Sequence, residues 1–201
     1  MKKYIVLQYE IHQWLSPLLL GGMLLTCTEP QGDLSPPGPK MEAISKVERG
    51  RYWVDVIGCN DCHSPKRFGP EGPQEIAELS LSGFPQDRPL PPIDLNAVES
   101  GWVMFVEDGT ASVGPWGVSF AGNLTSDATG IGNWTEENFI RAIKDGKLKG
   151  LEDERDLLPP MPWTLYRNLT DDDLAAIFAY LQTVPAVANV VPPPIAWENL
   201  K

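Results

Sequence analysis

Histidine and cysteine, two side chains that commonly bind metals, are scarce in this chain of 201 residues. There are two histidines, His12 and His63, and three cysteines, Cys27, Cys59 and Cys62. A structural zinc site takes four nitrogen or sulfur ligands, usually from two paired clusters, and the chain has no second closely spaced cysteine pair. Only His63 lies outside the N-terminal segment, so no histidine is left over to activate a serine or cysteine nucleophile.

Positive charge is also in short supply. The chain has 16 lysines and arginines against 27 acidic residues, and its formal net charge is −11 at pH 7. This balance disfavours nucleic acid and anionic lipid surfaces as partners, because both repel a negatively charged protein. It suits a protein partner with a basic docking patch, and it equally suits a surface that serves only solubility.

The most informative motif is Cys59-Asn60-Asp61-Cys62-His63. The spacing Cys-x-x-Cys-His is the attachment signature of a c-type haem. Each thiol can add across one haem vinyl group, and the following imidazole then lies under the iron. Zinc sites and dithiol redox sites have no need of a histidine at that position. The sequence around the motif also lacks the strand-then-helix pattern of a thioredoxin, so one covalent haem c is the favoured interpretation.

A second axial ligand for such an iron is expected from methionine. His12 falls in a segment that we expect to be removed, so the mature chain has no second histidine for the iron. Met41 lies beside a linker, and Met104 lies in an apolar run where methionine is usually a packing residue. Met161 lies in the sequence Leu-Pro-Pro-Met-Pro-Trp of residues 158–163, where flanking prolines favour a rigid, extended loop. We therefore predict Met161 as the ligand, a pairing that raises the reduction potential.

Taken with these motifs, the chain resembles the class I cytochrome c family. More narrowly, it is similar to bacterial mono-haem cytochromes akin to the cytochrome subunits of periplasmic dehydrogenases. The resemblance implies an electron carrier in which Cys59 and Cys62 attach the haem, His63 is the proximal ligand and Met161 is the distal ligand. It extends over about residues 44–187, and it is carried by residues 47–52, 59–65, 123–125, 129–135, 159–163 and 177–181.

The resemblance implies a mainly α-helical class I cytochrome c fold, but this chain is longer than a minimal member between His63 and Met161. Residues 64–100 are rich in proline and glycine and predict a loop around the haem. An Asp-Gly pair at 108–109 between two apolar runs predicts a small β-hairpin. We expect these to form an insert over residues 64–122, whose role the sequence does not indicate. Lys66 and Arg67 are more consistent with solvated surface charges than with partners of a haem propionate.

Three helices are expected in the cytochrome part. The first spans residues 44–57, and in the family a small residue at Gly50 would let the last helix cross closely; alternatively, that helix starts only at Arg51. Thr135 and Thr170 have the hydroxyl and the following acidic residues of helix N-caps. The last helix also shows an apolar spacing of i, i+3, i+4 and i+7 at Leu174, Ile177, Phe178 and Leu181.

The N-terminal region has the pattern of an export signal. Two lysines precede a short apolar run, which is shorter than the ~20 residues of a membrane span. Leu24-Leu25-Thr26-Cys27 resembles a bacterial lipoprotein cleavage box, although a plain signal peptide or an uncleaved anchor remains possible. We therefore predict a signal peptide over 1–26, lipidation at Cys27, a Pro/Gly-rich tether over 27–42, a cytochrome c domain over 43–187 and an extended C-terminal tail over 188–201.

Three functions are open at this point. The leading one is a one-electron carrier on the periplasmic side of a bacterial membrane, with a dehydrogenase as donor and an oxidase or another cytochrome as acceptor. The second is a cytochrome subunit docked to a periplasmic dehydrogenase, with the insert as docking surface. The third is an open-site haem enzyme or gas sensor, which the absence of a distal histidine disfavours. In the first two the chain is not itself an enzyme.

Overall fold

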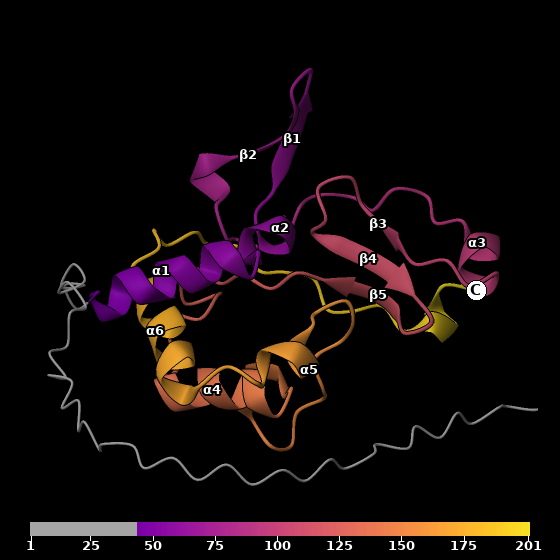
Figure 1. Cartoon of the computed structure of the whole chain (residues 1–201). Helices are drawn as coiled ribbons and strands as arrows, with labels where there is room; N and C mark the ends of the chain where they lie inside the picture. The colour runs from indigo at the N-terminus through magenta and orange to yellow at the C-terminus, as the bar shows by residue number, and fades with distance from the viewer. Residues whose placement is uncertain (1–43) are drawn as a thin grey trace, which may run out of the picture. The chain divides into compact units, whose positions relative to one another are not determined.

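The computed structural model describes residues 44–201 (Figure 1). The predicted signal peptide and tether, together with Cys27 and Met41, lie outside the described residues. The helices are α1 (Lys46–Val56), α2 (Cys59–His63), α3 (Leu95–Glu99), α4 (Glu136–Lys144), α5 (Trp163–Tyr166) and α6 (Asp171–Leu181), with single 3-10 turns at Ala77–Leu79, Leu148–Gly150 and Trp197–Asn199. The strands are β1 (Lys66–Gly69), β2 (Gly72–Glu75), β3 (Met104–Phe105), β4 (Ala111–Gly114) and β5 (Gly117–Phe120). Within residues 44–201, no helix has the length and apolar character needed to cross a membrane.

Helix α1 begins where its capping residues place it. The Ser45 hydroxyl accepts a hydrogen bond from the Glu48 amide at 3.2 Å, and the Glu48 carboxylate accepts one from the Ser45 amide at 3.1 Å. This reciprocal pair satisfies two amides that a helix N-terminus otherwise leaves unpaired. The helix runs through Gly50, so the interpretation that it starts at Arg51 is wrong. Val54 is fully buried, whereas Val47 is 38% exposed.

Helices α1 and α6 cross at Gly50. A Cβ atom added there would lie 1.9 Å from the carbonyl oxygen of Ala176, a distance that no side chain can occupy. The expectation that a small residue allows the last helix to cross closely is therefore confirmed. Next to the crossing, the buried carboxylate of Asp173 accepts hydrogen bonds from Arg49 Nε at 2.8 Å and from the indole of Trp53.

Helices α4 and α6 complete this helical part around one apolar cluster. Thr135 and Thr170 cap them by accepting hydrogen bonds from the amides of Asn138 and Asp173, both at 3.1 Å, so both predicted N-caps are confirmed. The cluster, called here the main core, includes all four residues of the predicted apolar spacing on α6. It consists of Val54, Leu81, Ile131, Phe139, Ile143, Leu174, Ile177, Phe178, Leu181 and Val184.

The insert is more ordered than the sequence suggested. Strands β1 and β2 form an antiparallel hairpin that projects away from the helices (Figure 1), and α3 follows it. The prediction that residues 64–100 form only a loop is therefore wrong. The hairpin escaped prediction because both of its strands are mostly exposed, so they carry no alternation of apolar and polar residues.

The predicted hairpin around Asp108-Gly109 is confirmed as the β3–β4 pair, in which Met104 is opposite Val113. Strand β5 extends it to a three-stranded antiparallel sheet in the order β3-β4-β5. Val113 of β4 and Val118 of β5 form a second core with Val98 of α3, and Met104 of β3 packs against it.

The C-terminal segment 188–201 packs on the same sheet. Val118 of β5 and Ile195 exchange two backbone hydrogen bonds of 2.8 and 3.0 Å. Gly117 has φ +90°, and a Cβ atom there would lie 2.0 Å from the Ile195 carbonyl oxygen. Ile195, Trp197 and Leu200 pack against the second core. The tail thus covers the β5 edge of the sheet.

Candidate functional site

The haem-attachment motif forms its own short helix, α2. Gly58 precedes it in the left-handed region, with φ 71°, and so separates it from α1. Cys59 and Cys62 are three positions apart, so their side chains lie on the same side of the helix. Neither thiol forms a disulfide, and both are half-buried. Cys59 packs against the main core.

The two thiols are poor nucleophiles in this environment. Burial raises the pKa of Cys59 to about 12, and burial together with the charge of Asp61 raises the pKa of Cys62. A reactive or redox-active cysteine needs the opposite shift, because only the thiolate attacks. The arrangement therefore disfavours a dithiol redox centre, and it leaves two protonated thiols, of which Cys59 packs against the main core.

His63 is held in one tautomer by the insert. Its Nδ1 atom lies 2.7 Å from the carbonyl oxygen of Gly122, which follows β5. Because a carbonyl can only accept, Nδ1 carries the proton and Nε2 keeps its lone pair. Burial lowers the pKa of His63 more than the Gly122 hydrogen bond raises it, so the ring is neutral at pH 7. A neutral imidazole oriented through its second nitrogen is what a metal ligand requires.

The Met161 loop is tied to the chain on both sides. The Met161 amide donates to the Leu158 carbonyl at 3.2 Å, and the Ser119 hydroxyl of β5 donates to the Pro159 carbonyl at 2.6 Å. The side chain of Met161 is partly buried against the main core, the cluster that Cys59 also contacts. The Tyr166 hydroxyl on α5 then donates to the Ile57 carbonyl at 2.9 Å, two residues before the motif.

The methionines are thus separated by the fold. Met161 and Cys59 both pack against the main core, whereas Met104 packs against the second core. The interpretation of Met104 as a packing residue is confirmed. The role of Met161 as a ligand remains a prediction, as do the roles of Cys59, Cys62 and His63.

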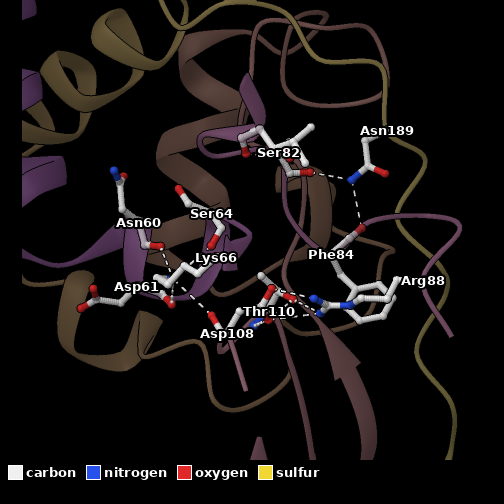
Figure 2. A network of polar contacts seen from close by, with 11 residues as sticks. Asn60, Asp61, Ser64, Lys66, Ser82, Phe84, Arg88, Asp108, Thr110 and Asn189 are labelled. Carbon is white, nitrogen blue, oxygen red and sulfur yellow. Dashed lines mark hydrogen bonds and ion pairs between the residues drawn. The ribbon is translucent and has the colours of Figure 1, made fainter. Parts of the chain in front are cut away.

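Lys66 is a residue of the site that sequence reasoning misjudged. Its ammonium group donates to the carbonyl oxygens of Asn60 at 3.0 Å, Asp61 at 2.7 Å, Ser64 at 3.0 Å and Asp108 at 3.1 Å (Figure 2). It is therefore not a solvated surface charge. A basic residue just beyond the C-terminus of a short helix was the available signal, because such ends carry unpaired carbonyls.

A buried ion pair within the insert holds Asp108, the residue whose carbonyl oxygen binds Lys66. The guanidinium of Arg88 binds the fully buried carboxylate of Asp108 through two hydrogen bonds of 2.6 and 3.1 Å, and it stacks over the Phe84 ring (Figure 2). The Thr110 hydroxyl donates to the same carboxylate at 2.8 Å. Hydrogen bonds from Arg88 and Thr110 outweigh the opposing effect of burial and hold the pKa of Asp108 below its usual value.

The donor set fits a c-type haem. Two thiols on one side of a short helix, an imidazole whose Nε2 keeps its lone pair and a thioether in a tied loop are groups that can attach and ligate such a haem. Zinc is a poorer match, because residues 44–201 contain no cluster of three or more His, Cys, Asp or Glu side chains arranged to hold a metal ion.

Comparison with known proteins finds several related sequences but does not assign the chain to a family. No model of a known protein family matches the chain. It is 38% identical over 175 residues to a nicotinate dehydrogenase subunit of Pseudomonas putida, a match that covers 85% of this chain and 12% of the relative. It is 26% identical over 162 residues to the fructose dehydrogenase cytochrome subunit of Gluconobacter japonicus, covering 80% of this chain and 26% of the relative.

A third relative is the gluconate 2-dehydrogenase cytochrome c subunit of Pantoea cypripedii. The identity is 27% over 135 residues, covering 67% of this chain and 22% of that relative. The chain therefore spans only between 12% and 26% of the length of these relatives. It is related in sequence to cytochrome subunits of dehydrogenases.

Proposed function

We propose that this chain transfers electrons through one covalently bound c-type haem, as a cytochrome subunit rather than a catalytic one. The observation that carries the proposal is the orientation of His63. Its Nδ1 donates to the carbonyl oxygen of Gly122 at 2.7 Å. His63 directly follows Cys62, and the thiols of Cys59 and Cys62 are half-buried and form no disulfide. The relationship to cytochrome subunits of fructose and gluconate dehydrogenases supports the same class of function.

Each residue of the site has a proposed role. Cys59 and Cys62 would form the thioether links, and His63 through Nε2 and Met161 through its sulfur would hold the iron. The haem, when bound, supplies the one-electron redox centre, and its ligands and burial set the potential. The hydrogen bonds to Gly122 and within the Met161 loop hold both ligands in place, which keeps reorganisation small when the oxidation state changes.

The proposed fold is that of class I cytochrome c for residues 43–187, with the insert between the haem motif and the Met161 loop. Helices α1 and α6 cross through Gly50, and Met161 lies against the core that they form. These contacts are the ones that such a fold needs around its haem motif.

The proposed partners are redox proteins. A dehydrogenase subunit is the donor, by analogy with the relatives, and an oxidase or another cytochrome is the acceptor. The net charge of −11 favours a partner that presents a basic docking patch. Whether the chain stays docked to one dehydrogenase or moves between partners separates the two carrier interpretations.

The proposed location is the periplasmic side of a bacterial membrane, with Cys27 as a lipid anchor. The test is Cys27→Ser, which should move the protein from the membrane fraction to the soluble periplasm or block its processing. Unchanged membrane association together with an unmodified N-terminal mass would leave only the plain signal peptide or the uncleaved anchor.

Haem attachment is the decisive test of the proposed function. The full chain, produced in a host that matures c-type cytochromes, should keep its pigment through acid-acetone extraction and denaturing electrophoresis. A Cys59→Ala, Cys62→Ala double variant should lose it, whereas Cys27→Ser should retain it as the matched cysteine control. Loss of pigment from the unaltered chain would contradict thioether attachment.

A second measurement separates a carrier from an open-site haem enzyme. The oxidised protein should show the sulfur-to-iron charge-transfer band at the red edge of its spectrum, and the reduced protein should bind carbon monoxide slowly. Rapid binding without that band would favour the open-site interpretation.

A further inference from the structure

We propose that Lys66 is a positioning residue for the haem-bearing helix α2 and that its ammonium charge raises the reduction potential of the bound haem. The inference rests on the proposed function, since it concerns a haem held by α2. It concerns a residue that neither attaches nor ligates the haem.

The geometry of Lys66 joins two regions of the chain. Three of its four acceptors are carbonyls of residues 60–64, within or just after α2, and the fourth is the carbonyl of Asp108 in the insert (Figure 2). An ammonium group has three hydrogens, so four acceptors use its full donor capacity. Lys66 therefore clamps the end of α2, where His63 lies, against the turn between β3 and β4.

The charge of Lys66 is not neutralised by an ion pair. None of the ion pairs within 4.0 Å in the described part of the chain includes Lys66. Asp108 contributes only its backbone carbonyl to Lys66, because its carboxylate is bound by Arg88 and Thr110. A positive charge with only neutral carbonyl partners thus lies next to the haem helix.

That charge lies beside the residues proposed to hold the haem. The Lys66 ammonium donates to the carbonyls of Asn60, Asp61 and Ser64, which flank Cys62 and His63 in the chain. An oxidised haem iron carries one more positive charge than a reduced one, so repulsion from the Lys66 charge disfavours oxidation. Removing the charge should therefore lower the reduction potential.

The test compares charge with hydrogen bonding in the full haem-bearing protein. Lys66→Gln removes the charge and keeps two N–H donors, Lys66→Met removes both, and Lys66→Arg keeps the charge. Arg67→Met is the matched control, because Arg67 is the next residue, has the same charge and is exposed. The readouts are the midpoint potential from spectroelectrochemical titration and the free energy of unfolding in urea.

At a fixed applied potential, Lys66→Gln and Lys66→Met should each raise the ratio of oxidised to reduced protein about tenfold. For a one-electron couple, this corresponds to a midpoint potential that is lower by ~59 mV. Lys66→Arg should stay close to the unaltered protein in potential. The free energy of unfolding should fall most in Lys66→Met. Arg67→Met should change neither quantity measurably.

Unaltered potentials in Lys66→Gln and Lys66→Met would overturn the electrostatic role, even if stability fell. An equal drop in Lys66→Arg would also overturn it, because charge would then not be the cause. If Lys66→Met loses no more stability than Arg67→Met, the clamp is wrong. If the unaltered chain attaches no haem, the proposed function fails instead, and the unfolding comparison still tests the clamp.

Discussion

The helical part and the insert are held together by different kinds of contact. Helices α1, α4 and α6 surround the main core of ten buried apolar residues, and their closest approach depends on Gly50. The insert contributes Leu81 to that core and has a second, smaller core of three buried valines, and it also contains polar contacts, chiefly those of Lys66 and the Arg88–Asp108 pair. Apolar burial dominates in the helical part, whereas the insert adds to it a network in which each polar group needs its partner.

The difference matters because the insert contacts the proposed haem site directly. Gly122 accepts from the His63 ring, and the Gly83 amide donates to the His63 carbonyl at 2.7 Å. A Cβ atom at Gly109 would lie 2.8 Å from the carbonyl oxygen of Asp61, so the β3–β4 turn lies tightly against α2. The insert is therefore part of the site, and substitutions within it should alter the orientation of His63.

The largest effect is expected at the α1–α6 crossing. Gly50→Ala should improve helix propensity by about 1 kcal/mol, yet its Cβ atom would lie 1.9 Å from the Ala176 carbonyl oxygen. We expect a net loss of about 3 kcal/mol or more, or no folded protein at all. Gly69→Ala is the control, because nothing lies within 4 Å of a Cβ there. Equal midpoints of urea unfolding for the two variants would refute the close crossing.

The next effect compares one methionine from each region. Met161→Ala should remove the sulfur-to-iron band, lower the reduction potential and open the iron to carbon monoxide. Met104→Leu should change none of these, because Met104 of β3 packs against the second core. The measurements are the oxidised absorption spectrum, a redox titration and carbon monoxide binding. If Met104→Leu or Met41→Leu abolishes the band instead, the substituted methionine is the ligand and the assignment of Met161 is wrong.

A smaller effect compares one ion pair from each region. Arg88→Met leaves the fully buried Asp108 carboxylate without its main partner and should cost about 2 kcal/mol or more. Lys46→Met breaks the exposed pair with Glu136 and should cost less than about 1 kcal/mol. Hydrogen exchange should show the loss in Arg88→Met first in the amides of β3 to β5. A similar cost for both variants would mean that the insert does not depend on this pair.

The smallest effect concerns acid. The pKa values of Asp108 and Asp173 are both lowered in the folded protein, chiefly by hydrogen bonds that outweigh burial. Their contributions to stability are therefore complete above the ordinary carboxyl value of 3.8 and are lost as the pH falls through the lower folded values. Unfolding curves measured from pH 6 downward should show this decline, and Asp108→Asn and Asp173→Asn should each flatten it. An unchanged slope in both variants would contradict the assignment.

The helical part could be predicted because its signals are local. The caps at Thr135 and Thr170 and the apolar spacing on α6 follow from neighbouring residues in the sequence. The β3–β4 hairpin was predictable for the same reason, since Asp-Gly marks the turn. Strands β1 and β2 were not, because exposed strands show no alternation of apolar and polar residues.

By itself, the sequence determined the chemistry that the site can offer: two thiols and an imidazole at haem spacing, and one methionine between prolines. Only the tertiary structure decided how these groups are oriented. The carbonyl that selects the His63 tautomer belongs to Gly122, the oxygen that secures Lys66 to the insert belongs to Asp108, and Ile195 covers the edge of β5. These contacts use backbone atoms, which every residue has, and they join segments distant in the chain. They therefore cannot be predicted from residue types or from local spacing in the sequence.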